Sequence, residues 1–113
     1  MTECIFCKIV SGDIPSKKAF ENDEVLAFHD IVPIAPTHIL VIPKEHIPSA
    51  AVLEERHAGL LGSLFAVIAK LAKQLGHSDG FRIVSNVGER AGQSVPHLHF
   101  HLIAGRVLSW PPG

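Results

Sequence analysis

The sequence predicts an α+β fold, with a mainly antiparallel five-stranded sheet, one long helix on a face of the sheet and a short helix near the N-terminus. The long helix is expected at residues 53–75, where apolar residues recur at three- and four-residue steps. Short apolar segments that we expect to be strands precede and follow this helix in the sequence. Several strands with only one long helix between them favour antiparallel pairing. With 113 residues, of which 47% are hydrophobic, we expect one domain over residues 1–113.

The part of the chain before the long helix contains a predicted short helix and three predicted strands. The helix is expected at residues 4–10, because this mostly apolar run ends at a Ser-Gly-Asp-Ile-Pro breaker. A corner at Asn22-Asp23 separates the first two strands. The third strand is β-branched and apolar between Pro36 and Pro43, which is typical of a strand covered on both faces. The three strands are expected at residues 17–21, 24–29 and 37–42.

The long helix has its own end signals, and two more strands follow it. Glu54 and Glu55 lie at the positive N-terminal end, and Gly76 is the expected stop. After the helix we expect a strand at residues 80–87, a glycine-bearing loop at 88–94 and a last strand at 97–104.

Charge and cysteine content exclude several classes of protein. The formal net charge of −1 argues against a general nucleic-acid binder, which needs a basic face, so an anionic ligand must be held locally. No apolar run approaches the roughly 20 residues that cross a bilayer, and the N-terminal residues do not form a signal peptide. We therefore expect a soluble cytoplasmic protein with no membrane partner.

Three histidines alternate with apolar residues in the last predicted strand. His97, His99 and His101 should point to one face and the intervening residues to the core, because side chains alternate along a strand. A solvated edge-strand face and a metal site made by these three residues are the competing interpretations. Upstream, Gly92 and Gln93 offer backbone amides and Ser94 offers a hydroxyl to an anion, although a glycine-containing hairpin turn would have the same composition.

The His-Leu-His-Phe-His run resembles the motif of the histidine-triad (HIT) superfamily of nucleotide-binding hydrolases and transferases. Four further segments resemble the Hint branch of this superfamily. They are His29-Asp30-Ile31, Ala35-Pro36-Thr37-His38, Gly92-Gln93-Ser94 and the terminal Trp-Pro-Pro-Gly. The resemblance covers nearly the whole chain. It implies a HIT-like fold and a homodimer in which the long helix and residues 81–87 form the interface and the two sheets become continuous.

The resemblance also implies a reaction and a set of roles. Hint proteins are nucleoside phosphoramidate hydrolases, so His99 would attack the α-phosphorus of a purine, specifically adenosine, 5′-phosphoramidate and form a covalent nucleotidyl-histidine. His101, His38 and Ser94 would assist at the phosphate, and Asp30 would accept both ribose hydroxyls. Trp110 would reach the site of the partner subunit. The remaining implied nucleotide contacts are Ile5, Phe6, Ile9, Phe28, Ile31, Leu40, Asn86, Gly92 and Gln93.

Cys4 and Cys7 have the spacing of half a zinc site. A redox pair and two inert buried thiols are the alternatives that the residues themselves leave open. The superfamily resemblance implies that His46 and His97 complete a structural zinc site, with no metal needed for the chemistry.

Two other functions compete with the phosphoramidase. One is hydrolysis of dinucleoside polyphosphates, as in the Fhit branch, which lacks the Trp-Pro-Pro-Gly ending. The other is a dimeric nucleotide-binding regulatory module without catalysis.

Overall fold

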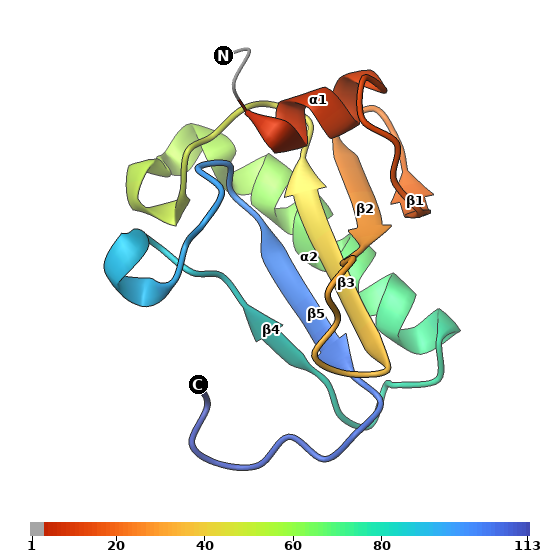
Figure 1. Ribbon diagram of the computed structural model, residues 1–113. Helices are drawn as coiled ribbons and strands as arrows, with labels where there is room; N and C mark the ends of the chain where they lie inside the picture. Colours follow the sequence, from red (N-terminus) through yellow and green to blue (C-terminus); the bar gives the residue numbers. More distant parts are fainter. Residues whose placement is uncertain (1–3) are drawn as a thin grey trace.

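The computed structural model describes residues 4–113 and contains one antiparallel sheet between two helices of very different length (Figure 1). The strand order is β1-β2-β3-β5-β4, and every neighbouring pair is antiparallel. The strands are β1 (Lys18–Glu21), β2 (Val25–His29), β3 (Thr37–Pro43), β4 (Arg82–Val84) and β5 (Phe100–Ala104). The helices are α1 (Ile5–Ser11) and α2 (Ala58–Gln74), with short 3-10 turns η1 (Ala50–Val52), η2 (Glu55–His57) and η3 (Glu89–Ala91). The predicted α+β class and five-stranded sheet are confirmed.

Both faces of the central strands are covered, each by a different helix. Along β2, Val25 and Ala27 belong to the core under α2, whereas Leu26 and Phe28 belong to a second core with α1. Residues of β3 divide in the same alternating way, and the strand is buried from His38 to Pro43. This explains why the sequence of β3 is apolar throughout and does not alternate.

The histidine run lies on the α1 side of the sheet. Leu98, Phe100 and Leu102 point into the core under α2, so the three histidines face the other way, as their spacing predicts. The strand β5 lies between β3 and β4, which excludes the solvated edge-strand interpretation. Regular pairing begins only at Phe100, because the Leu98 amide donates to the carbonyl of Ile47 outside the sheet.

Three predicted elements are longer than those in the structure, by three residues or more. The long helix starts at Ala58 instead of residue 53, since residues 50–57 form two 3-10 turns and Glu54 caps the second one. The predicted strand at 80–87 pairs only over Arg82–Val84, and the last strand is shorter at its N-terminal end. Leu75 and Gly76 end α2, with Gly76 in the left-handed region at φ 83°.

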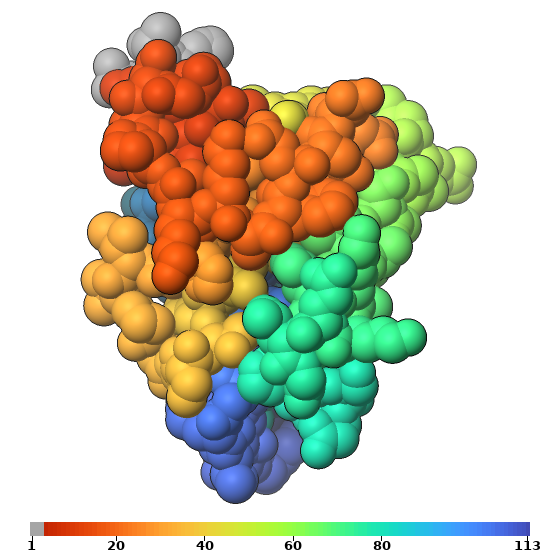
Figure 2. Space-filling view, turned by 90° about the vertical axis from the view of Figure 1, so that its right-hand side faces the viewer, coloured from red at the N-terminus to blue at the C-terminus, as the bar shows by residue number. Residues whose placement is uncertain are grey.

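The two ends of the described chain lie far apart. Figure 2 shows the N-terminal segment and the β1–β2 hairpin at one end of the molecule and the C-terminal segment at the other. The tail is held beside β4, where Arg82 Nη2 donates to the carbonyl of Ser109 at 2.8 Å. Neither helix of the described part is long and apolar enough to cross a membrane.

Candidate active site

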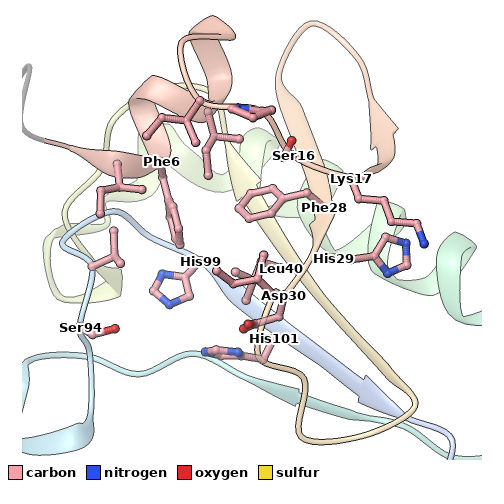
Figure 3. A pocket seen from close by; sticks show the side chains of 16 residues that line it. Phe6, Ser16, Lys17, Phe28, His29, Asp30, Leu40, Ser94, His99 and His101 are labelled. Carbon is pink, nitrogen blue, oxygen red and sulfur yellow. The ribbon is translucent and has the colours of Figure 1, made fainter.

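A cavity of about 600 Å³ lies between α1 and the sheet, in the size range of small-molecule sites (Figure 3). Ten of the predicted nucleotide-binding residues line it: Ile5, Phe6, Ile9, Phe28, Asp30, Ile31, Leu40, Ser94, His99 and His101. Six further residues line the cavity that the sequence did not predict as nucleotide contacts, namely Ile14, Pro15, Ser16, Lys17, His29 and Val95. Four of these belong to the segment that leads from α1 back to β1, and the breaker at residues 11–15, which turns the chain there, was the available signal.

One end of the cavity is apolar. Phe6 and Phe28 meet edge to face with their ring centroids 5.5 Å apart, and Leu40 lies beside them. Ile31, on the loop after β2, lines the cavity although 95% of it is exposed. An exposed apolar side chain at the mouth and an aromatic pair inside suit a flat, hydrophobic ring such as a nucleobase.

The other end is polar and is dominated by His99. This residue is only 6% exposed, and its Nδ1 lies 2.7 Å from the carbonyl oxygen of His97. A carbonyl only accepts, so Nδ1 carries the hydrogen and Nε2 keeps its lone pair. The ring of Phe6 packs edge-on against His99, with centroids 5.1 Å apart. The bond to His97 thus selects, for the neutral ring of His99, the tautomer in which Nε2 can act as a nucleophile.

His38 and His101 form a hydrogen-bonded pair beside His99. The Ile34 amide donates to His38 Nδ1 at 3.2 Å, so the hydrogen of neutral His38 is on Nε2. That atom lies 2.9 Å from His101 Nδ1 and 3.5 Å from Asp30 Oδ2. His101 Nδ1 must then accept, which leaves its Nε2–H as a donor on a ring that lines the cavity.

Burial keeps both members of this pair neutral. It lowers the pKa of His101 to about 4, and the neighbouring His99 and His38 add to the shift. Burial also lowers the pKa of His38, against the opposing effect of the Asp30 carboxylate. At neutral pH the pair of His38 and His101 is therefore uncharged.

The glycine loop makes a smaller contribution than the sequence suggested. The amides of Gly92 and Gln93 donate to the carbonyls of Glu89 and Gly88, so they are not free for an anion. The Gln93 side chain also bonds within the protein, and the Asn86 amide donates to Ala91. Asn86, Gly92 and Gln93 do not line the cavity, and Ser94 is the loop residue that does. The loop closes on itself through a 3-10 turn, which its composition did not predict.

Trp110 is also outside this cavity. It is 85% exposed in the C-terminal segment, at the opposite end of the molecule from α1. Its expected role depends on a second subunit.

The two cysteines and two histidines expected to bind a metal lie together next to the cavity. Cys4 Sγ is 3.3 Å from His97 Nδ1, Cys7 Sγ is 3.2 Å from His46 Nδ1, and the two nitrogens are 3.3 Å apart. A tetrahedral zinc ion separates such ligand atoms by about 3.4 Å for two nitrogens and about 3.6 Å for sulfur and nitrogen. His97 Nε2 donates to the carbonyl of Pro43 at 2.9 Å, which leaves Nδ1 as the ligand atom. The four residues fit a metal ion.

This arrangement separates the three histidines of the run. His97 faces the cysteines, His99 donates to a backbone carbonyl, and His101 accepts from His38. They do not converge on one point, so a single metal held by all three is excluded in the described structure.

Comparison with known proteins identifies the family. The model of the HIT domain matches residues 11–108. This chain belongs to the HIT family. Among curated HIT relatives it is 51% identical to the adenylylsulfatase HINT1 of Arabidopsis thaliana over 96% of this chain and 76% of the relative. It is 50% identical to the 14 kDa zinc-binding protein of Zea mays over 96% of this chain and 87% of that protein.

Solved HIT structures agree closely with the fold. A HIT family hydrolase from Legionella pneumophila Philadelphia 1 is 46% identical, with a TM-score of 0.96 and coverage of 98% of this chain and all of the other. A histidine triad protein from Clostridium difficile is 45% identical, with a TM-score of 0.92 and coverage of 96% of each chain. The resemblance inferred from the histidine run and the Trp-Pro-Pro-Gly ending is confirmed.

Proposed function

We propose that this HIT protein hydrolyses the P–N bond of purine nucleoside 5′-phosphoramidates, with adenosine as the preferred nucleoside, to AMP and an amine. The observation that carries the proposal is the fixed tautomer of His99, whose Nδ1–H is bound by the carbonyl of His97. A neutral imidazole with a free Nε2 is nucleophilic at pH 7, where a lysine is protonated. The hydrolase names of HIT relatives support the same reaction class.

The reaction would proceed in two displacements at the α-phosphorus. His99 Nε2 forms a bond to phosphorus while the P–N bond to the amine breaks, and the departing nitrogen takes a proton through the Ser94 hydroxyl. Water then attacks the same phosphorus, its proton passes back through the Ser94 hydroxyl, and the bond to His99 breaks to release AMP. The Nε2–H of His101 would donate to a phosphate oxygen as its negative charge grows. His38 would act through His101, by holding it in the donor tautomer.

The rest of the cavity would bind the nucleoside. The Asp30 carboxylate lies between the apolar end and the histidines, and its Oδ1 accepts the amide of Val32, which fixes the carboxylate. Two carboxylate oxygens suit the paired hydroxyls of ribose. Phe6, Phe28 and Ile31 would enclose the base.

A second candidate substrate is adenylyl sulfate. It is favoured by the name of the Arabidopsis relative, which is 51% identical. The same attack by His99 would then expel sulfate in place of an amine. Initial rates of the purified protein on AMP phosphoramidate, adenylyl sulfate and a diadenosine polyphosphate test the proposal. It requires the first rate to be highest, and faster cleavage of either other compound would replace it.

We also propose that the active form is a homodimer joined at β4. This strand is an edge of the sheet, and Ile83 on it is 38% exposed. Phe65 on α2 and Leu75, the residue that caps its C-terminal end, are exposed apolar residues as well. Pairing of two β4 strands would cover this edge, join the two sheets and bring Trp110 towards the partner's cavity.

Finally, we propose that the cluster of Cys4, Cys7, His46 and His97 holds a structural zinc ion. When bound, zinc would cross-link α1 to the sheet without contacting the phosphate. Burial lowers the pKa of His97, which keeps its imidazole deprotonated as a ligand. The zinc-binding name of the Zea mays relative supports this proposal.

A further inference from the structure

We propose that the metal cluster and the nucleotide cavity are linked through α1, so that each ligand strengthens the binding of the other. A metal ion in the cluster would increase the affinity for a nucleotide, and a bound nucleotide would make the metal harder to remove. The inference rests on the nucleotide binding and metal binding proposed above. The new element is that a metal ion in the cluster changes the affinity of the cavity for a nucleotide, although the ion would not contact the nucleotide.

The two sites share one short helix. Cys4, the N-cap of α1, and Cys7 in its first turn provide half of the metal ligands. Ile5, Phe6 and Ile9, from the same two turns, line the cavity. A seven-residue helix cannot place one set of side chains independently of the other.

This helix depends on external contacts for its position. Seven residues are fewer than the roughly 12 to 15 that an isolated helix needs for even marginal stability in water. Among residues 4–113, the hydrogen bonds that join α1 to anything beyond Ile14 are those of the two cysteine sulfurs. The remaining attachment is side-chain packing, of Phe6 and Ile9 on β2 and β3 and of Phe6 against His97 and His99.

The other half of the cluster is attached to the sheet. His97 Nε2 donates to the carbonyl of Pro43 at the end of β3, and the Leu98 amide donates to the carbonyl of Ile47, next to His46. Neither contact requires a metal. When the metal is removed, α1 therefore loses a restraint, whereas His97 keeps its bond to the carbonyl of Pro43.

Phe6 transmits this change to the reacting residue. Its ring centroid lies 5.9 Å from that of His97, 5.1 Å from that of His99 and 5.5 Å from that of Phe28, in edge-to-face contacts. The same ring thus touches a metal ligand, the nucleophile and the base-binding wall. Phe6 is a positioning residue between the two sites.

Linkage of this kind is reciprocal, which gives a sharp test. Isothermal titration calorimetry measures the Kd of AMP for the zinc-loaded and the zinc-free full-length protein, with far-UV circular dichroism on both. A competing chelator then measures the Kd of zinc with and without saturating AMP. We expect each ligand to tighten the other at least about fivefold, by the same factor in both directions.

Variants separate the role of α1 from general stability. Phe6→Leu keeps all four metal ligands and removes the edge-to-face contacts. In this variant the AMP affinity of the zinc-loaded protein should therefore be nearly equal to that of the zinc-free protein. Lys8→Ala, on the same helix but outside the cavity, should keep the ratio of the wild type.

Three results would overturn the inference. One is an equal AMP affinity with and without zinc, and another is an unchanged ratio in Phe6→Leu. The third is loss of the far-UV signal of the sheet on zinc removal, because the linkage would then reflect global unfolding. Failure of the zinc-loaded protein to bind AMP at all is distinct, and would instead contradict the proposed function.

Discussion

The Nδ1 atom of His99 lies 2.7 Å from the carbonyl oxygen of His97, whose own ring faces Cys4 and Cys7. One residue therefore takes part in two sites. Its backbone sets the tautomer of the proposed nucleophile, and its side chain belongs to the metal cluster. The spacing of two between these histidines makes this possible, because both rings then lie on the α1 side of the sheet.

His99→Asn should abolish turnover and preserve binding. The amide is close in size to the imidazole but cannot form the covalent intermediate, so we expect kcat for AMP phosphoramidate to fall by about 10³-fold or more. The Kd of AMP, measured by calorimetry, should change little. Turnover within tenfold of the wild type would show that His99 is not the nucleophile.

Asp30→Ala should remove discrimination between ribose and dideoxyribose. The wild-type protein should bind AMP about 10- to 100-fold more tightly than 2′,3′-dideoxy-AMP, since the Asp30 oxygens would bind two hydroxyls. In the variant the two ligands should bind alike. If the variant still prefers ribose by the wild-type factor, the hydroxyls bind elsewhere.

Stability should increase with pH between about 4 and about 6.5. The pKa of His101 is about 4 in the folded chain and 6.5 as an ordinary histidine, so the unfolded chain binds more protons in this window. Above about 6.5 this contribution is constant, and it is lost as the pH falls towards 4. Urea unfolding across this range, for the wild type and His101→Gln, isolates the effect. The variant should show a shallower slope, and parallel curves would contradict the pKa assignment.

Cys4→Ser and Cys7→Ser should each lower the zinc content. Elemental analysis of protein purified without chelator should find about one zinc per wild-type chain and much less in either variant. The melting temperature should fall with the metal, because α1 loses its cross-link to the sheet. Ser11→Ala, on α1 but outside the cluster, is the matched control and should retain the metal. Wild-type protein without zinc would refute the site.

Ile83→Lys should weaken the dimer. A charge at the exposed centre of β4 disfavours pairing of this edge with a second copy. Light scattering after size exclusion should give the mass of two chains for the wild type and of one for the variant. A monomeric wild type would contradict the proposed interface and the proposed role of Trp110 together.

The alternation of side chains allowed much of the fold to be predicted from the sequence. The spacing of His97, His99 and His101 predicts that the three side chains share a face of the extended chain. This holds although β5 begins only at Phe100, so that His97 and His99 precede the regular strand. The start of the long helix was less predictable, because apolar spacing does not distinguish the 3-10 turns at 50–57 from the helix that follows. His57, a polar residue just before α2, is only 3% exposed, and its Nδ1 accepts the amide of Glu54.

Parts of the site depended on contacts that a sequence does not contain. The glycines of the loop at 88–94 suggested free amides, yet the 3-10 turn uses those of Gly92 and Gln93 internally. Lining residues such as Ser16 and Lys17 come from a segment whose path over the sheet is set by the packing of α1. The tautomers of His38 and His99 follow from backbone partners that only the folded chain brings near.

The covalent intermediate is the central claim of the proposed mechanism. Rapid acid-free quenching of the protein during turnover of AMP phosphoramidate, followed by peptide mass spectrometry, tests it directly. We predict an adenylyl adduct on the peptide that contains His99, absent from His99→Asn. Turnover without an adduct, or an adduct on another residue, would contradict the mechanism, and binding of AMP without turnover would indicate a regulatory module instead.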